Sequence, residues 1–233
     1  MDWGKVVSGI VVGGVLGIAG TVYLFNSRLS RVEALVERRA GEPPVLESAS
    51  TRPDSPDRVI LEEDFGGNAL GWFVKTEADA SRTIEGGKYK FRINDPKKQI
   101  YWAHISAPEL PANVDICVSA IWREGDKDEI FGLSFYSDVD NYMLAGLAQS
   151  GYALIKVKSA GTRHEPLRMS RAGAPPGAAV EICALRRGKQ LTLQVDGNDA
   201  GKVDADAFEW KRIGVAVWGN QSVDFDRLVI AKG

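Results

Sequence analysis

The chain has 233 residues, of which 44% are hydrophobic and 26% charged, and its 29 basic and 31 acidic residues give a formal net charge of −2. This composition is typical of a globular protein and excludes a collagen, a disordered tail and a multi-span transporter. The near-neutral charge gives no global attraction to nucleic acid, so we expect no nucleic-acid partner. Two cysteines and two histidines are too few for a disulfide scaffold or a histidine-rich metal centre, so we expect no metal and no cofactor.

Residues 6–25 form an apolar stretch without a charged side chain. As a helix, such a stretch is about 30 Å long, which matches the hydrocarbon thickness of a bilayer. Trp3 and Tyr23 flank it, as expected at membrane interfaces. Because the stretch is longer than the apolar core of a signal peptide and no clean A-x-A cleavage site follows, we predict an uncleaved single-pass transmembrane helix, with the lipid bilayer as a partner.

Glycines recur along one side of this predicted helix. Gly9, Gly13 and Gly17 are spaced four residues apart and form two overlapping GxxxG motifs, and Gly20 lies close to the same side. Such a stripe predicts close packing against a helix of another membrane-protein subunit, in either a homodimer or a hetero-complex. The alternative is that glycine is simply common in membrane helices.

Two further segments precede the main domain. Apolar residues at helical spacing predict a juxtamembrane extension of the helix over residues 26–40, so that 1–40 form one membrane unit. Residues 41–58 contain four prolines and three serines, which predicts a semi-rigid linker.

Residues 59–233 are predicted to form one all-β domain. Short β-rich runs alternate with turn signals, and Gly86-Gly87 predicts a two-residue hairpin turn. About twelve strands at this spacing indicate an antiparallel sandwich or barrel. The expected strands cover 83–85, 88–93, 99–106, 114–122, 130–136, 141–148, 152–158, 180–186, 190–195, 213–218 and 223–230.

Several motifs in this domain resemble a known family. The opening 64–72 (DFGGNALGW), the middle segment 131–142 (FGLSFYSDVDNY) and the closing segments 214–217 and 223–226 are similar to concanavalin A-like lectin/glucanase sandwich domains, in particular to 3-keto-disaccharide hydrolase (DUF1080)-type domains. The resemblance implies a concanavalin A-like jelly-roll sandwich. It does not imply an activity, because the shared residues belong to turns and core strands.

Three acidic clusters are candidate catalytic or calcium sites. Glu124, Asp126 and Glu129 have a spacing found in some glucanases of this fold, but no apolar residues separate them as a half-buried strand requires, so we predict a solvated turn. Asp138, Asp140 and Asn141 have calcium-like spacing but are predicted to form an Asx turn. Asp224 and Asp226 share one face of a strand, and an outward polar face explains them as well as a site does.

Neither histidine has the neighbours of a metal site or of an acyl-transfer motif, so His104 and His164 are predicted to be structural or surface residues. Exposed tryptophans could instead stack on sugar rings, with burial in the core as the alternative. The candidates for stacking are Trp72, Trp102, Trp122 and Trp218, and Trp210 is a further tryptophan of the domain.

The sequence leaves two questions open. Cys117 and Cys183 could form a disulfide in an exported domain or remain two buried thiols. Arg28, Arg31, Arg38 and Arg39 follow the predicted span, which by the positive-inside rule favours a cytoplasmic domain. An anchor this close to the start is, however, the usual arrangement for export, so we favour the periplasmic side of the cell (inner) membrane.

Together these features predict a non-enzymatic accessory subunit. Its glycine-striped helix would dock in a larger membrane complex, such as a photosynthetic or respiratory assembly, and its sandwich would pack on that complex. A membrane-tethered carbohydrate-binding module is the alternative, and a glycoside-processing enzyme is a third interpretation that no catalytic residue set supports.

Overall fold

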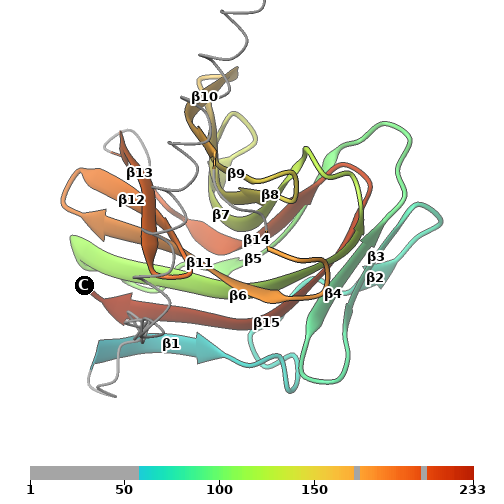
Figure 1. Ribbon diagram of the computed structural model, residues 1–233. Coiled ribbons are helices and arrows are strands. Elements are labelled where there is room, and N and C mark those ends of the chain that lie inside the picture. The colour runs from blue at the N-terminus through green and yellow to red at the C-terminus, as the bar shows by residue number, and fades with distance from the viewer. Residues whose placement is uncertain (1–57, 171–173, 206–208) are drawn as a thin grey trace, which may run out of the picture. The chain divides into compact units, whose positions relative to one another are not determined.

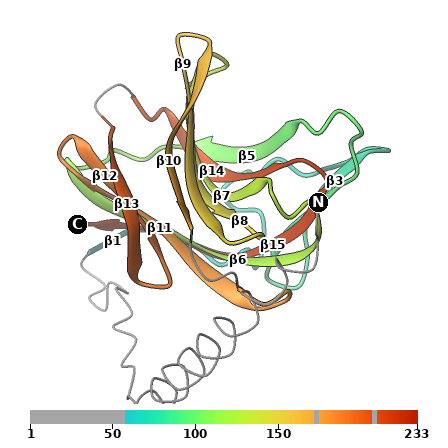
Figure 2. The same ribbon diagram turned by 45° about the horizontal axis from the view of Figure 1, so that its top comes forward.

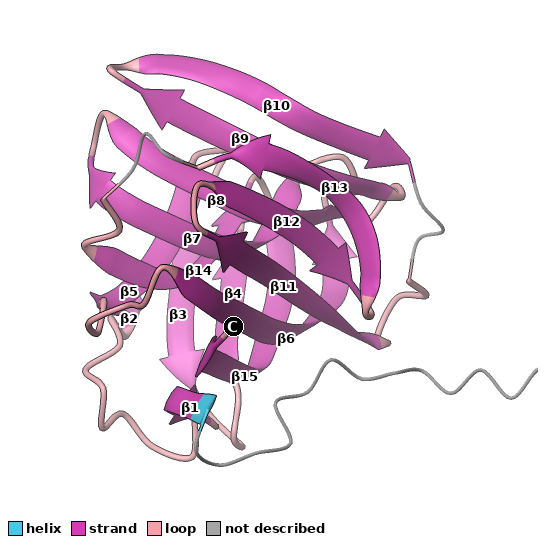
Figure 3. Ribbon diagram, turned by 90° about the vertical axis from the view of Figure 1, so that its left-hand side faces the viewer, coloured by secondary structure: helices cyan, strands magenta, loops and turns pink. Residues whose placement is uncertain are grey.

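The structure is a computed structural model that describes residues 58–170, 174–205 and 209–233. The described chain folds into two antiparallel sheets, seen in Figures 1 and 3. The large sheet has the strand order β13-β12-β11-β6-β15-β4-β3-β2, and β1 also pairs with β15. The small sheet has the order β10-β9-β8-β7-β14-β5. An all-β antiparallel sandwich is therefore confirmed.

The strands of the large sheet are β1 (Val59–Glu63), β2 (Lys75–Thr76), β3 (Ala80–Ile84), β4 (Tyr89–Ile93), β6 (Asn113–Gly125), β11 (Ala179–Arg187), β12 (Gln190–Val195), β13 (Asn198–Asp204) and β15 (Gln221–Lys232). Those of the small sheet are β5 (Ile100–Ser106), β7 (Ile130–Asp138), β8 (Asn141–Ala148), β9 (Tyr152–Ser159), β10 (Thr162–Ser170) and β14 (Arg212–Trp218).

The core lies between the inner faces of the two sheets. In β4 the buried residues Tyr89, Phe91 and Ile93 alternate with outward Lys90 and Arg92, which is the period-2 pattern of a half-buried strand. The central strands β7 and β8 differ, because consecutive residues along them are buried on both faces. The outer face of the small sheet is therefore covered by side chains as well, and these form a second, smaller apolar cluster.

Most predicted strands are present with bounds close to those expected. The predicted turn joins β3 to β4, and both Gly86 (φ 59°) and Gly87 (φ 66°) adopt the left-handed conformation that such a turn requires. β1, β2, β10 and β13 were not predicted. β2, β10 and β13 are edge strands of their sheets, and β1 pairs only with β15 among the described strands. The stretch after Asp196-Gly197, which held no expected strand, pairs with β12.

The predicted membrane unit lies outside the described residues, as does most of the linker. This applies to the span 6–25 with Gly9, Gly13, Gly17 and Gly20, to the extension to residue 40, and to linker residues 41–57. Within the part of the chain that the structure describes, no helix has the length and apolarity needed to cross a bilayer.

Cys117 and Cys183 form a disulfide across two neighbouring strands. They are directly paired in the β6–β11 register, with Cα atoms 4.1 Å apart, although 66 residues separate them along the chain. Both alternate with inward-facing core residues, so the bond lies on the outer face of the large sheet. The question that the sequence left open is thus answered in favour of pairing.

Candidate functional site

Aromatic side chains gather on the outer face of the small sheet. The strand registers place Trp102 of β5 beside Ala216, Gly132 and Gly146, and Tyr136 of β7 beside Tyr142 of β8. Tyr152 and Trp218 belong to the same outward set. We call the surface formed by Trp102, Tyr136, Tyr142, Tyr152 and Trp218 the aromatic face.

Three glycines lie near the centre of this face. Gly132, Gly146 and Gly214 lie on the three neighbouring strands β7, β8 and β14. A Cβ atom added to any of them would lie within 2.6 Å of a backbone oxygen of a neighbouring strand. These glycines therefore permit the strands to approach closely, and they leave room in which larger residues from the margins can lean inward.

Trp102 and His104 use this room. The Trp102 ring lies 5.3 Å from the rings of both Tyr136 and Tyr142, although β14 and β7 separate β5 from β8. His104 reaches across Gly214 to form a 2.8 Å hydrogen bond with the Ser134 hydroxyl. Burial lowers the pKa of His104 to about 4, and the charge of Arg212 acts in the same direction. His104 is therefore a neutral part of the face at physiological pH.

Trp218 stands at the boundary between two hollows. Lys156 Nζ lies 4.3 Å from the centre of its ring, the Arg163 guanidinium lies 5.4 Å away, and its indole N–H donates to the Lys98 carbonyl at 3.0 Å. One hollow, of about 310 Å³, is lined by Lys97, Lys98, Gln99, Ile100, Trp102, Val139, Tyr142, Lys158, Arg163 and Trp218. The other, of about 260 Å³, shares Tyr142, Arg163 and Trp218 with it. Figure 2 shows β9 and β10, which carry Lys156 and Arg163, projecting from the sandwich. Trp218 comes from β14, which β8 and β7 separate from β9 in the small sheet.

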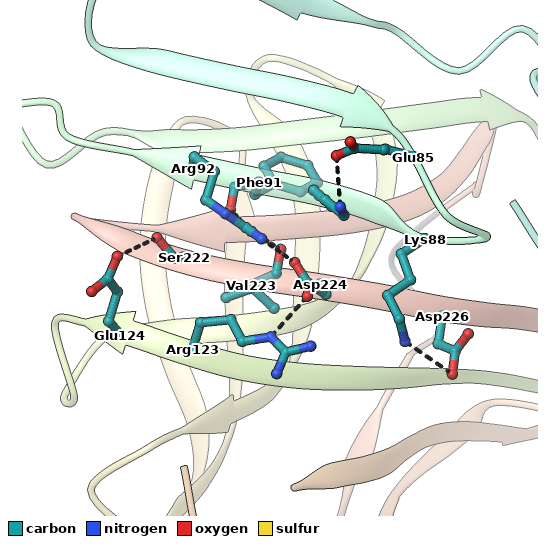
Figure 4. A network of polar contacts seen from close by, with 11 residues as sticks. Glu85, Lys88, Phe91, Arg92, Arg123, Glu124, Ser222, Val223, Asp224 and Asp226 are labelled. Carbon is teal, nitrogen blue, oxygen red and sulfur yellow. Dashed lines mark hydrogen bonds and ion pairs between the residues drawn. The ribbon is translucent and has the colours of Figure 1, made fainter. Parts of the chain in front are cut away.

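The outer face of the large sheet is polar. Asp224 of β15 accepts a hydrogen bond from Arg92 of β4 at 2.6 Å and from Arg123 of β6 at 2.8 Å (Figure 4). Its side chain is 3% exposed. Burial acts to raise its pKa, but the two guanidinium groups outweigh burial and lower it. Asp226 lies at a bulge in β15 and pairs instead with Lys88 at 3.6 Å, so the two carboxylates have separate ion-pair partners.

A larger hollow of about 570 Å³ opens beside this network, and no aromatic side chain lines it. Glu124 borders it and receives a 3.4 Å hydrogen bond from the Ser222 hydroxyl. Asp126 and Glu129 lie in the bend between β6 and β7, where Asp126 pairs with Lys98 at 3.2 Å and Glu129 with Lys156 at 3.5 Å. The predicted turn is therefore confirmed for residues 126–129, but Glu124 was wrongly placed in it, because β6 extends to Gly125. Each of these carboxylates has a different partner.

The calcium-like cluster is an Asx turn. The Asp138 carboxylate accepts hydrogen bonds from the backbone N–H of Asp140 at 2.8 Å and from the Asn141 side chain at 2.9 Å. These bonds, the Asp140 one first, lower the pKa of Asp138. Over residues 58–170, 174–205 and 209–233, no group of three or more acidic, histidine or cysteine side chains is arranged to hold a metal ion.

The tryptophans divide into two groups. Trp102 and Trp218 are half-buried on the aromatic face, whereas Trp72 and Trp122 are buried in the core at 2% and 6% exposure. Trp210 is also buried, stacked on Phe135 at 4.4 Å. Trp72 and Trp122 therefore offer no ring to a ligand, which corrects the expectation for half of the stacking candidates. His164 is exposed on β10 and borders the smaller of the two hollows at Trp218.

Other residues of this surface carried no distinctive signal in the sequence. They are ordinary outward residues, some beside a turn, and they come from four different strands. Only the strand register brings them together: Tyr136, Tyr142, Lys158 and Arg163.

No protein-family model matches the sequence, and no curated protein is significantly similar to it. Solved structures are similar to it. The carbohydrate binding module CBM66 from Bacillus subtilis has a TM-score of 0.56 at 15% identity, over 70% of this chain and 96% of that chain. The GH43 protein BlXynB from Bacillus licheniformis has a TM-score of 0.56 at 16% identity, over 74% of this chain and 39% of its own.

A third similar structure is the xylan beta-1,4-xylosidase from Bacillus halodurans C-125, with a TM-score of 0.57 at 14% identity over 77% of this chain and 41% of the enzyme. The chain thus spans about two fifths of each of these two Bacillus proteins. Identities this low show the fold alone, a sandwich consistent with the predicted concanavalin-like class. The narrower resemblance to 3-keto-disaccharide hydrolase domains stays a prediction.

Proposed function

We propose that this protein binds carbohydrate through the aromatic face and catalyses no reaction. The observation that carries the proposal is the pair of half-buried tryptophans, Trp102 and Trp218, that line one hollow together with Tyr142. Aromatic rings at the wall of an open hollow offer flat apolar surfaces, and the surrounding polar groups can orient a ligand. The hollow of about 310 Å³ is at the lower end of the range for small-ligand sites.

Two further points support this proposal. One of the structural neighbours is itself a carbohydrate binding module, and the similarity covers almost its whole length. The acidic clusters are also poorly suited to glycoside hydrolysis, which needs one carboxyl group with a raised pKa. Asp224, the most buried of these candidates, has its pKa lowered by two arginines and is better suited to an ion pair.

We further propose that the sandwich is tethered by the helix predicted at 6–25 and faces the extracytoplasmic side. The support is the Cys117–Cys183 bond, because disulfides persist in oxidising compartments and are rare in the cytosol. Alkylation of intact cells, followed by reduction and mass spectrometry of the two cysteines, tests the sidedness. Finding them as free thiols in the cell would overturn it.

Binding is tested with the full chain in mild detergent against a panel of soluble polysaccharides, by affinity electrophoresis and tryptophan fluorescence. Replacing Trp102 or Trp218 by Ala is expected to weaken binding about tenfold, which corresponds to about 1.4 kcal/mol. Phe73→Ala is the matched control, because Phe73 is an exposed aromatic residue (49%) outside the aromatic face. If no saccharide binds, or if all three variants bind equally well, the proposal fails.

The accessory-subunit interpretation remains a second proposal, and it rests on the glycine stripe Gly9, Gly13 and Gly17. Its test is purification in mild detergent followed by mass spectrometry of the proteins that accompany the chain. Replacing the three glycines by Leu is expected to remove those partners. A lone monomer, or partners unchanged in the variant, would count against a packed helix.

A further inference from the structure

We propose that the hollow between Trp102 and Trp218 takes an anionic sugar unit, so that the ligand is an acidic polysaccharide carrying carboxylate or sulfate groups. This inference rests on the proposed carbohydrate binding and narrows its ligand class. The larger hollow on the other sheet has no aromatic lining and contains carboxylates of its own, so it offers such a ligand neither stacking nor attraction.

Cationic side chains from three places along the chain converge on this hollow. Lys97 and Lys98 come from the loop before β5, Lys158 from the end of β9, and Arg163 from the start of β10. Lys158 and Arg163 are directly paired in the β9–β10 register, so their side chains lie next to each other. No carboxylate is among the residues that line the hollow. For a chain with a net charge of −2, this is a marked local concentration of positive charge.

Part of this charge has no anionic partner in the described chain. Lys158 pairs with Asp140 at 2.8 Å and Lys98 with Asp126 at 3.2 Å, and both acids lie outside the lining. Among the described residues no carboxylate forms an ion pair with Arg163, whose guanidinium lies 5.4 Å from the Trp218 ring centre. Arg163 thus presents planar N–H donors beside an aromatic wall, an arrangement suited to a carboxylate or sulfate group on a stacked sugar ring.

The indole N–H of Trp218 supports the same arrangement. It donates to the Lys98 backbone carbonyl, and this bond ties the loop that carries Lys97 and Lys98 to the aromatic wall. Two of the cations are therefore positioned by the same side chain that is proposed to stack on the sugar.

The test uses the full chain in mild detergent and pairs of polymers that differ only in charge. The carboxylate pair is polygalacturonate and its methyl ester, and the sulfate pair is dextran sulfate and dextran. The variants are Arg163→Gln and Lys97→Gln, both at exposed positions, and the control is Lys202→Gln, an exposed lysine on β13 of the other sheet. Binding is measured at low and high salt.

We expect at least one charged polymer to bind at least tenfold more tightly than its neutral partner, with that preference weakened by salt. We expect Arg163→Gln to reduce the preference about tenfold, Lys97→Gln to reduce it less, and Lys202→Gln to leave it unchanged. A preference for the carboxylated or for the sulfated pair identifies which anion is recognised.

Three results would overturn the inference. Equal binding of charged and neutral polymers, with loss in Trp102→Ala, would leave carbohydrate binding intact and remove the anionic specificity. A preference for charged polymers that is equally weakened by Lys202→Gln would indicate diffuse attraction and not this hollow. Absence of binding to any saccharide would remove the proposed function together with the inference.

Discussion

The indole N–H of Trp72 donates a 2.8 Å hydrogen bond to the carboxylate of Glu63, which is 7% exposed. The other carboxylate oxygen accepts the backbone N–H of Phe65 at 2.8 Å. Trp72 then packs against Phe65 and Tyr89 at ring distances of 5.3 Å and 5.5 Å. The segment 64–72, which resembles lectin-like sandwiches, thus packs against the core and helps to close it. Trp72 is therefore unavailable to a sugar.

Replacing Glu63 by Ala is expected to destabilise the domain by about 2–3 kcal/mol, because two buried N–H groups lose a charged acceptor. Urea unfolding followed by tryptophan fluorescence measures this. Glu62→Ala is the control, since Glu62 is 45% exposed and pairs with Arg227 on the surface, where a loss below about 1 kcal/mol is expected. Equal losses in the two variants would contradict the role given to Glu63.

Replacing Asp224 by Asn is expected to cost about 2 kcal/mol at pH 7, because two arginines lose their shared carboxylate. The native pKa of Asp224 is lowered, so its contribution is complete above the unfolded-state pKa of about 4 and is lost as the pH falls through the native value. The stability difference between wild type and variant should therefore be constant from pH 7 to 5 and shrink below pH 4. Asp226→Asn, at a more exposed pair, should show little of this.

We expect His104 to cause a second pH dependence of folding stability, at higher pH than that of Asp224. Its native pKa of about 4 lies below the unfolded value of about 6.5, so the unfolded chain binds more protons between these limits. Its contribution to stability is complete above about pH 6.5 and declines as the pH falls towards 4. His104→Gln should flatten this part of the stability curve, whereas His164→Gln, at an exposed position, should leave it unchanged.

The disulfide predicts a large effect of reduction. Closing a loop of 66 residues stabilises a protein by about 2–4 kcal/mol. A reductant should lower the thermal midpoint of the wild type and have no effect on the double variant Cys117→Ala, Cys183→Ala. An unchanged midpoint in the reduced wild type, with both thiols titrated as free, would contradict this.

We expect a side chain at one of the central glycines to destabilise the domain by steric overlap. In Gly146→Ala the new Cβ would lie 2.0 Å from the Phe131 carbonyl oxygen, so a loss of more than about 2 kcal/mol is expected. Gly67→Ala is the control, because no atom lies within 4 Å of its added Cβ. Thermal unfolding of the two variants compares them directly.

The strand pattern in the sequence predicted the sandwich well wherever one face of a strand is apolar. It did not predict β10, whose residues are nearly all exposed at a sheet edge and show no alternation. It also missed β13, although Asp196 and Gly197 both have positive φ in the turn before it, as expected for an Asp-Gly hairpin. The sequence therefore contained the signal for the turn. The strand that follows the turn is exposed and polar, so no apolar pattern predicted it.

The binding surface was less predictable for a different reason. In β5 the sequence IYWAHIS is apolar on both faces, so alternation alone cannot say whether Trp102 points inward or outward. Only pairing with distant strands decides this, as it also decides that Cys117 meets Cys183. The cations at the hollow come from separate segments, and no local motif connects them.

The glycine centre of the small sheet has a consequence for how specificity could change. Gly132, Gly146 and Gly214 fix how closely the strands approach, whereas the hollows are lined by side chains from the margins of the sheet. The packing of the sheet and the selectivity of the surface are therefore separable. Related sequences could exchange the marginal residues, and so bind different polymers, while keeping the same sheet.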